Sequence, residues 1–167
     1  IQVLFKAILC HRMQWEHTDF LSNSTTAVFS ESDLLFFKQC INRLLKKEPI
    51  QYILGETYFY NLTLKCKKEV LIPRPETEEL VEWIIQSTTF SGPLQIHDLC
   101  TGSGCIGLAL KNQNPKHEVF LSDISPYSIE LSIENKDLNN LNVNILKIDS
   151  LKNIPIDYFK ENAFDIW

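Results

Sequence analysis

A glycine-containing loop, Asp98-Leu99-Cys100-Thr101-Gly102-Ser103-Gly104, holds the residues of this chain best suited to bind a ligand. It follows an apolar stretch at 94–96 and leads into an apolar helix at 106–110. Because glycine lacks a Cβ, Gly102 and Gly104 allow a sharp turn and a close approach of a ligand to the backbone. The N-terminus of the following helix leaves amide donors unpaired. The loop therefore predicts a cradle for a nucleotide-like cofactor.

Two classes of cofactor fit the spacing of the glycines. Gly102, Gly104 and Gly107 satisfy the G-x-G-x-x-G pattern of dinucleotide-binding dehydrogenases. Asp98 favours the other class, because a carboxylate that ends the strand before the loop is common in S-adenosylmethionine sites, whereas the dehydrogenase turn normally has an apolar residue there. We expect a methyltransferase and keep an NAD(P)-type nucleotide-binding domain as the alternative, since a fold alone does not fix a chemistry.

Strand and helix patterns alternate from residue 94 onward. The predicted strands are 94–97, 119–121 and 143–148, and the predicted helices between them are 106–111 and 126–135. This βαβαβ order indicates an α/β fold with a parallel sheet and helices on its faces.

Acidic residues follow the second and third predicted strands. Asp123 lies just past the second strand, where a carboxylate can accept hydrogen bonds from both ribose hydroxyls of a bound nucleoside. Asp149 ends the third strand, near where the edge of an adenine would lie. Because ligands bind at the carboxyl ends of parallel strands, we expect Asp98, Asp123 and Asp149 to mark one site.

The segments before residue 94 have a different texture. The first 54 residues predict helices, among them one that is capped at Ser30 and carries apolar side chains on one face (Leu34, Phe37, Ile41, Leu44 and Leu45). Aromatic and β-branched residues around Asn61 predict a short hairpin. Pro75 and the glutamates after it predict a helix N-terminus, and Leu80, Val81, Ile84 and Ile85 its buried face. We therefore divide the chain into a helical domain (1–54), a hairpin linker (55–72) and an α/β domain (73–167).

Composition excludes several classes of function. Hydrophobic residues make up 44% and charged residues 22% of the chain, and no apolar run is long enough to span a membrane. The net charge of -5 argues against a broad nucleic-acid-binding surface. The 5 cysteines form no C-x-x-C pair, and no histidine stands at ligand spacing near Cys100 or Cys105, so we expect reduced thiols in the cytoplasm and no metal site.

Three segments taken together resemble the HemK/PrmC family, the methyltransferases that modify the N5 of glutamine in peptide chain release factors. They are residues 48–55 (EPIQYILG), 71–78 (LIPRPETE) and 98–104 (DLCTGSG). The resemblance covers nearly the whole chain, and its most specific part is Pro-Arg-Pro-Glu-Thr-Glu at 73–78.

This resemblance implies a class I S-adenosylmethionine-dependent methyltransferase (Rossmann-like) fold, incomplete at its C-terminal end, after a helical domain that helps to dock the release factor. It also implies that S-adenosylmethionine is held by Cys100, Thr101, Gly102, Ser103 and Gly104, with Asp123 on the ribose and with Asp149 and Ser150 beside the adenine. The substrate would be the glutamine of the release factor's Gly-Gly-Gln motif, and we expect a cytoplasmic monomer without direct nucleic-acid or membrane partners.

The family's Asn-Pro-Pro-Tyr motif, which presents the substrate amide, does not occur in the 167 residues. Residues 164–167 match the strand that leads to this motif in the family. We therefore expect a chain that is truncated before its catalytic residues, carries only the cofactor-binding part, is poorly stable and transfers no methyl group by itself. The alternative from a non-enzyme class is a fragment that only binds a release factor through residues 1–54.

Overall fold

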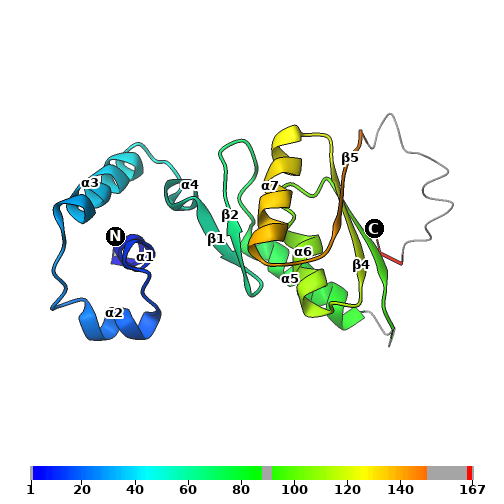
Figure 1. The fold of residues 1–167 in the computed structure, drawn as a ribbon, viewed down its shortest axis with the longest axis horizontal. Helices are drawn as coiled ribbons and strands as arrows, with labels where there is room; N and C mark the ends of the chain where they lie inside the picture. Colours follow the sequence, from blue (N-terminus) through cyan, green and yellow to red (C-terminus); the bar gives the residue numbers. More distant parts are fainter. Residues whose placement is uncertain (1, 88–91, 150–164, 167) are drawn as a thin grey trace. The chain divides into compact units, whose positions relative to one another are not determined.

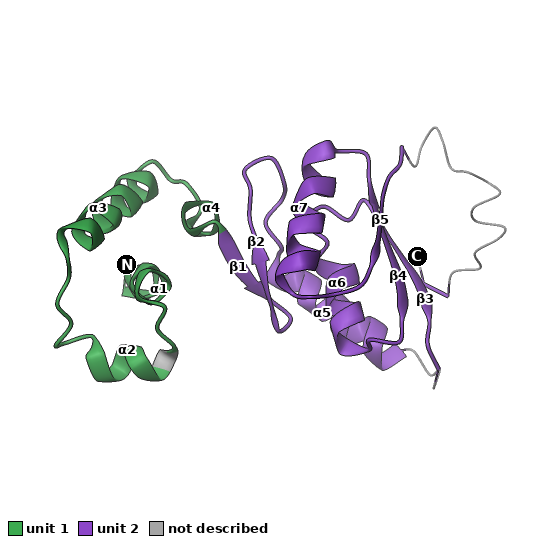
Figure 2. Cartoon of the chain, viewed as in Figure 1, with its two compact units in different colours: residues 1–55 green, residues 56–167 purple. Residues whose placement is uncertain are grey.

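The computed structural model describes residues 2–87, 92–149 and 165–166, and the chain forms two compact units (Figure 2). The first unit is Ile1–Gly55 and the second is Glu56–Trp167. Within the described residues, no helix is both long enough and apolar enough to cross a membrane.

The first unit is helical, as predicted. It consists of α1 (Gln2–Met13), α2 (His17–Asn23), α3 (Glu31–Leu45) and α4 (Ile50–Leu54), shown in blue to cyan and teal in Figure 1. Its core is formed by Ile8, Leu9, Phe37, Cys40 and Ile53. The predicted cap of α3 is confirmed, because the Ser30 hydroxyl accepts a hydrogen bond from the Asp33 amide and the Asp33 carboxylate accepts one from the Ser30 amide.

The apolar face predicted for α3 is only partly buried. Phe37 is buried and Leu44 packs against the core, but Leu34, Ile41 and Leu45 are 55%, 47% and 77% exposed. Cys40 takes a core position in their place. Sequence periodicity identifies an apolar stripe on a helix, whereas the small neighbouring helices of this unit cover only the part of the stripe that faces them.

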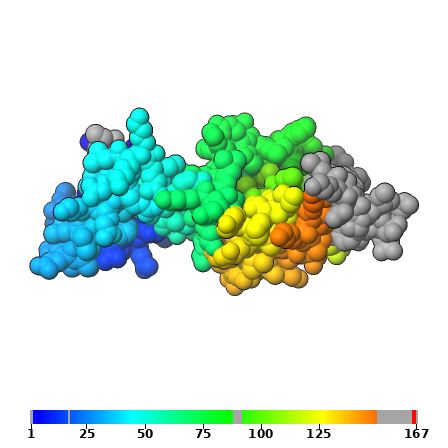
Figure 3. Space-filling view, turned by 90° about the horizontal axis from the view of Figure 1, so that it is seen from above, coloured from blue at the N-terminus to red at the C-terminus, as the bar shows by residue number. Residues whose placement is uncertain are grey.

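The second unit begins with the predicted hairpin. Strands β1 (Glu56–Phe59) and β2 (Leu62–Lys65) pair antiparallel, with Glu56 opposite Lys65. Tyr60 and Asn61 form the turn with φ of 41° and 65°, and two left-handed residues in a two-residue turn match the twist of a hairpin. The hairpin lies within this unit, and the space-filling view shows its green segment beside the yellow segment of α7 (Figure 3).

A parallel sheet with the predicted βαβαβ order forms the rest of the second unit. Its strands are β3 (Gln95–Leu99), β4 (Glu118–Asp123) and β5 (Asn144–Lys147), in the order β3-β4-β5. Helix α6 (Cys105–Gln113) follows β3, and α7 (Pro126–Leu138) follows β4. Ile166 forms a parallel bridge with Ile96, on β3.

Helix α5 (Pro75–Ser87) precedes the sheet and starts at Pro75, as predicted. Val81 is buried and Ile84 and Ile85 pack against the core, while Leu80 is 39% exposed, contrary to the prediction. Both crossovers step in the same direction across the sheet, so their helices share one face. Figure 1 shows α5, α6 and α7 on that side of the strands. The loop between β3 and α6 lies at the carboxyl ends of the strands, where ligands bind in open α/β sheets.

Candidate cofactor site

The loop between β3 and α6 turns through three left-handed residues. Cys100, Gly102 and Gly104 have φ of 58°, 57° and 84°. A Cβ on Gly102 would meet nothing closer than a Val70 methyl group at 3.7 Å, so glycine is favoured here by the left-handed backbone conformation and not by lack of space. The left-handed conformation of Cys100 could not be predicted from the sequence, because a residue with a Cβ rarely adopts it.

Asp98 turns inward and braces the loop. Its Oδ2 accepts a hydrogen bond from the Thr101 hydroxyl at 2.7 Å and one from the Gly107 amide at 3.0 Å. Burial raises the pKa of Asp98, the two hydrogen bonds oppose that shift, and the nearby charge of Asp123 adds to it. Asp98 therefore ties the loop to the first turn of α6.

Asp123 lies against the same loop from the end of β4. Its Oδ2 accepts a hydrogen bond from the Gly102 amide at 3.0 Å, and its Oδ1 accepts one from the Ser125 amide at 2.9 Å. Each carboxylate oxygen has a second lone pair, and the side chain is only partly buried. Asp123 can therefore accept further hydrogen bonds, and the structure brings it to the glycine loop as the sequence predicted.

The five loop residues differ in what they expose. Cys100 is exposed and Gly102 is partly exposed, whereas Thr101 and Ser103 are 6% and 3% exposed and Gly104 is buried. The Thr101 hydroxyl is bound to Asp98, and the Thr101 amide donates to the carbonyl of Ser122, on β4, at 3.0 Å. A ligand at this loop would meet the backbone of Gly102 and the exposed residue Cys100 first.

Gly107 makes room for the loop at the start of α6. A Cβ at this position would lie 2.2 Å from Cδ2 of Leu121, which is fully buried on β4. The third glycine of the pattern thus serves the close packing of helix on strand, a requirement common to both cofactor classes considered from the sequence.

The third predicted acid comes close to the same edge of the sheet. The Ile148 amide donates to the Asp123 carbonyl at 3.1 Å, and Asp149 follows it as a partly buried residue. Ser150 lies outside the described residues. Among the residues that the structure describes, no group of three or more His, Cys, Asp or Glu could hold a metal ion.

Sequence reasoning missed Asn135. This side chain is fully buried on α7, and it hydrogen-bonds both to the Ser103 carbonyl of the loop and to the Lys65 backbone of the hairpin. The available signal was an amide side chain within a helix, on the same face as the buried Leu131. Its partners, far away in the sequence, could not be read from that pattern.

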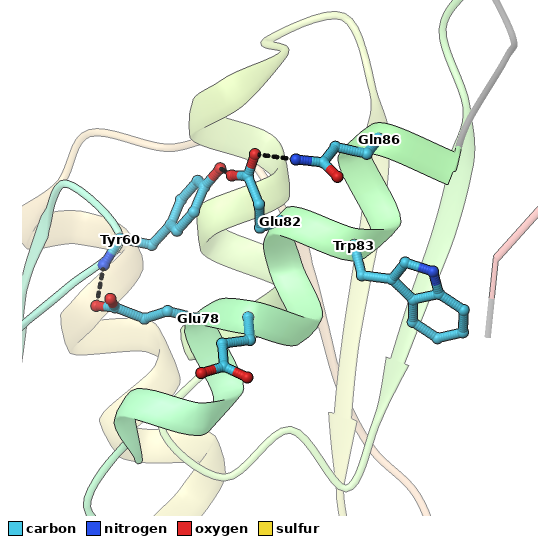
Figure 4. A pocket seen from close by; sticks show the side chains of 6 residues that line it. Tyr60, Glu78, Glu82, Trp83 and Gln86 are labelled. Carbon is cyan, nitrogen blue, oxygen red and sulfur yellow. Dashed lines mark hydrogen bonds between the residues drawn. The ribbon is translucent and has the colours of Figure 1, made fainter.

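A hollow beside the hairpin turn lies against α5 (Figure 4). Glu78 accepts a hydrogen bond from the Tyr60 amide at 2.8 Å, and Glu82 accepts one from the Tyr60 hydroxyl at 2.6 Å. The Tyr60 hydrogen bond, with a second from Gln86, lowers the pKa of Glu82. Trp83, 66% exposed, points away from this group. These contacts join the hairpin turn to α5, whose first turn is formed by the end of the Pro-Arg-Pro-Glu-Thr-Glu segment.

Comparisons with known proteins divide the chain in a similar way. Residues 4–55 match the family described as PrmC N-terminal domain, and residues 78–162 match the family described as Methyltransferase small domain. The release factor glutamine methyltransferase of Thermodesulfovibrio yellowstonii is 40% identical over 159 residues, which are 94% of this chain and 55% of the relative. That of Streptococcus pneumoniae is 38% identical over 141 residues, 84% of this chain and 50% of the relative. The chain thus spans about half the length of the curated relatives it matches.

Solved methyltransferases share the fold. A human methyltransferase 10 domain containing protein has a TM-score of 0.52 at 18% identity, over 83% of this chain and 59% of its own. The delta-N METTL16 MTase domain has a TM-score of 0.52 at 21% identity, over 62% of this chain and 48% of its own. Together with the parallel sheet, this likeness confirms the predicted class I, Rossmann-like methyltransferase fold.

Proposed function

The chain belongs to the HemK/PrmC family of methyltransferases, joining a PrmC N-terminal domain to a methyltransferase small domain, and we propose that its second unit binds S-adenosylmethionine at the loop 98–104. The observation that carries this proposal is the position of Asp123, whose carboxylate touches the Gly102 amide at 3.0 Å and remains partly exposed. A carboxylate at the end of the second strand, beside a glycine loop, suits the two hydroxyls of a ribose.

The residues present fit such a cofactor. Gly102 has no Cβ, and Cys100 is exposed, so backbone atoms of the loop are open to a flat, polar ligand. In this proposal Asp123 accepts the ribose hydroxyls, while Asp149 and Ser150 lie beside the adenine. Thr101, Ser103 and Gly104 are buried, so in this proposal they contribute by keeping the backbone of the loop in its binding conformation.

When bound, S-adenosylmethionine supplies a methyl group on a sulfonium, ready for in-line displacement. An amide nitrogen is a poor nucleophile, so the enzyme must orient the amide and draw charge toward its nitrogen. The 167 residues contain no Asn-Pro-Pro-Tyr sequence for this task. We therefore propose that this chain supplies the cofactor side of N5-methylation of the Gly-Gly-Gln glutamine in a peptide chain release factor, and that it does not catalyse transfer alone.

Titration calorimetry with S-adenosylhomocysteine and with NAD tests the cofactor. We expect binding of S-adenosylhomocysteine and no tight binding of NAD, because the NAD(P)-type domain is the competing function. Asp123→Ala should weaken binding about 10- to 100-fold, since hydrogen bonds to a charged group contribute about 1.5–3 kcal/mol. Asp137→Ala, which removes an exposed carboxylate from α7, is the matched control and should bind like the unchanged chain. Tight NAD binding would contradict the proposal.

A methylation assay with a release factor tests whether this chain transfers the methyl group by itself. We expect no methyl transfer by the 167-residue chain, and turnover would contradict this expectation. We further propose a cytoplasmic monomer whose first 54 residues dock the release factor. Capture of a release factor without any binding of S-adenosylhomocysteine would instead favour a non-catalytic binding fragment.

A further inference from the structure

Two asparagines, Asn135 within α7 and Asn139 at its C-terminal cap, bind the edge of strand β2 that β1 does not pair. Asn135 Oδ1 accepts a hydrogen bond from the Lys65 amide at 2.6 Å, and its Nδ2 donates to the Lys65 carbonyl at 3.4 Å. Asn139 Nδ2 donates to the Thr63 carbonyl at 2.9 Å. Four residues along a helix rise about 6 Å, and two residues along a strand about 6.7 Å, so the two spacings match. The asparagine side chains therefore satisfy backbone groups at an edge of β2 that could otherwise pair with another strand.

Only Asn135 also reaches the glycine loop. Its Nδ2 donates to the Ser103 carbonyl at 2.9 Å, and both residues are almost completely buried. An asparagine amide group has two hydrogens, so one donates to Ser103 and the other is available to Lys65. A single carboxamide therefore holds the docked hairpin and the loop at the same time.

The Ser103 carbonyl has a strong requirement for this partner. A buried carbonyl without a hydrogen bond is unfavourable, and the next residue, Gly104, has a left-handed φ of 84° that its missing side chain leaves free to change. Without Asn135, we expect the peptide between Ser103 and Gly104 to rotate, so that the Ser103 carbonyl accepts a hydrogen bond from another donor. That peptide leads directly into α6.

We propose that Asn135 is a positioning residue for the cofactor loop, which it holds in its binding shape through the Ser103 carbonyl while it also binds the docked hairpin. This inference rests on the proposed binding of S-adenosylmethionine, because the function of the loop is taken from it. The ion pairs of Lys67 with Glu130 and Glu134, at 2.9 Å and 2.7 Å, also hold the segment after β2 on α7.

The test compares Asn135→Ala with Asn139→Ala in the whole chain. Both substitutions remove a bridge from α7 to β2, but only the first removes a contact with the loop. Hydrogen exchange is measured at residues 99–105 and 62–66, and the affinity for S-adenosylhomocysteine is measured by calorimetry. A fall in thermal stability is expected for both variants and does not separate the two roles.

We expect Asn135→Ala to speed exchange in the loop and to weaken S-adenosylhomocysteine binding, each by about tenfold or more. Asn139→Ala should affect exchange only in the hairpin, with the affinity within about twofold of the unchanged chain. Equal loop exchange and equal affinity in the two variants would overturn the inference.

Two further outcomes are possible: the unchanged chain binds no S-adenosylhomocysteine, or Asn135→Ala does not fold. If the unchanged chain binds no S-adenosylhomocysteine, the proposed function fails, and loop exchange alone decides whether Asn135 positions the loop. If Asn135→Ala does not fold, Asn135→Ser replaces it, because the serine hydroxyl can hydrogen-bond to a backbone carbonyl of its own helix and is too short to hold both Lys65 and Ser103. Loop exchange as slow as in the unchanged chain would then overturn the inference.

Discussion

Gly107→Ala is the substitution for which the structure makes the sharpest prediction. Gly107 faces β4 from the first turn of α6, and an added Cβ would lie 2.2 Å from Cδ2 of Leu121. It would also lie 3.2 Å from Cβ of Asp98 and 3.2 Å from Cγ1 of Val119. Carbon atoms normally approach to about 3.5–4.0 Å, so the closest pair must separate by more than about 1 Å.

The expected loss of stability follows from what can move. Leu121 and Val119 are 0% and 1% exposed, so neither side chain can swing into solvent, and either the helix shifts or the leucine leaves its rotamer. Overpacking of this kind lowers the free energy of unfolding by about 1–3 kcal/mol. The better helix propensity of alanine returns about 1 kcal/mol. With the contact this short, we expect a net loss of about 2 kcal/mol.

The shift should also reach the cofactor loop. The Gly107 amide donates to Asp98, and Asp98 holds the Thr101 hydroxyl, so movement of the helix N-terminus disturbs both contacts. We therefore expect weaker binding of S-adenosylhomocysteine in Gly107→Ala, in addition to the lower stability.

Urea denaturation followed by circular dichroism measures the effect. Gly92→Ala is the matched control, because a Cβ on Gly92 meets nothing within 4 Å. This control should leave the stability unchanged or raise it by about 0.4–1 kcal/mol through the unfolded state. A Gly107→Ala chain that is as stable as the unchanged one would refute the packing argument.

The remaining predictions concern single polar contacts. Thr101→Val should lower the free energy of unfolding, measured by urea denaturation, by about 1–3 kcal/mol, because it takes a hydrogen bond from the partly buried Asp98; an unchanged midpoint would contradict the bracing role. The Ser30 hydrogen bonds, with help from Arg12, lower the pKa of Asp33 from 3.8 to about 2, so its stabilisation is complete above pH 3.8 and is lost as the pH falls toward 2. An NMR titration should find this pKa, and Asp33→Asn should remove that part of the acid dependence. Lys67→Met should change stability by less than about 1 kcal/mol, and the difference should shrink in high salt, because its ion pairs are partly exposed.

Local patterns predicted most of the fold. The capped start of α3, the hairpin around Asn61 and the start of α5 at Pro75 each depend on neighbouring residues, and the structure has all three where the sequence predicted them. The parallel βαβαβ order follows from periodicity and from the handedness of crossovers. The contact of Asp123 with the glycine loop follows from the same topology.

The sequence could not reveal contacts between distant segments. Asn135 meets Lys65, which is 70 residues away in the chain, and helix periodicity does not indicate such a partner. The inward turn of Asp98 depends on a helix amide that only tertiary packing brings close. The exposure of Leu34 and Leu80 could not be predicted for the same reason, because the apolar stripe of a helix does not indicate which of its residues a neighbouring element covers.

Contacts within the protein hold the loop in its shape. The Thr101 amide donates to β4, the Gly102 amide donates to Asp123, and the Ser103 carbonyl accepts from Asn135. A preformed loop binds more tightly, because less conformational freedom is lost on binding.

These contacts differ in whether they can also touch the ligand. Asp123 is partly exposed and is proposed to accept the ribose hydroxyls, so its substitution removes a ligand contact and a loop contact together. Asn135 is fully buried, so its substitution can weaken binding only by releasing the loop. The loss of affinity in Asn135→Ala, compared with Asn139→Ala, which affects only the hairpin, therefore measures the preorganisation of the loop. The additional loss in Asp123→Ala then measures the contact with the ribose, provided that hydrogen exchange shows the loop to be equally released in both.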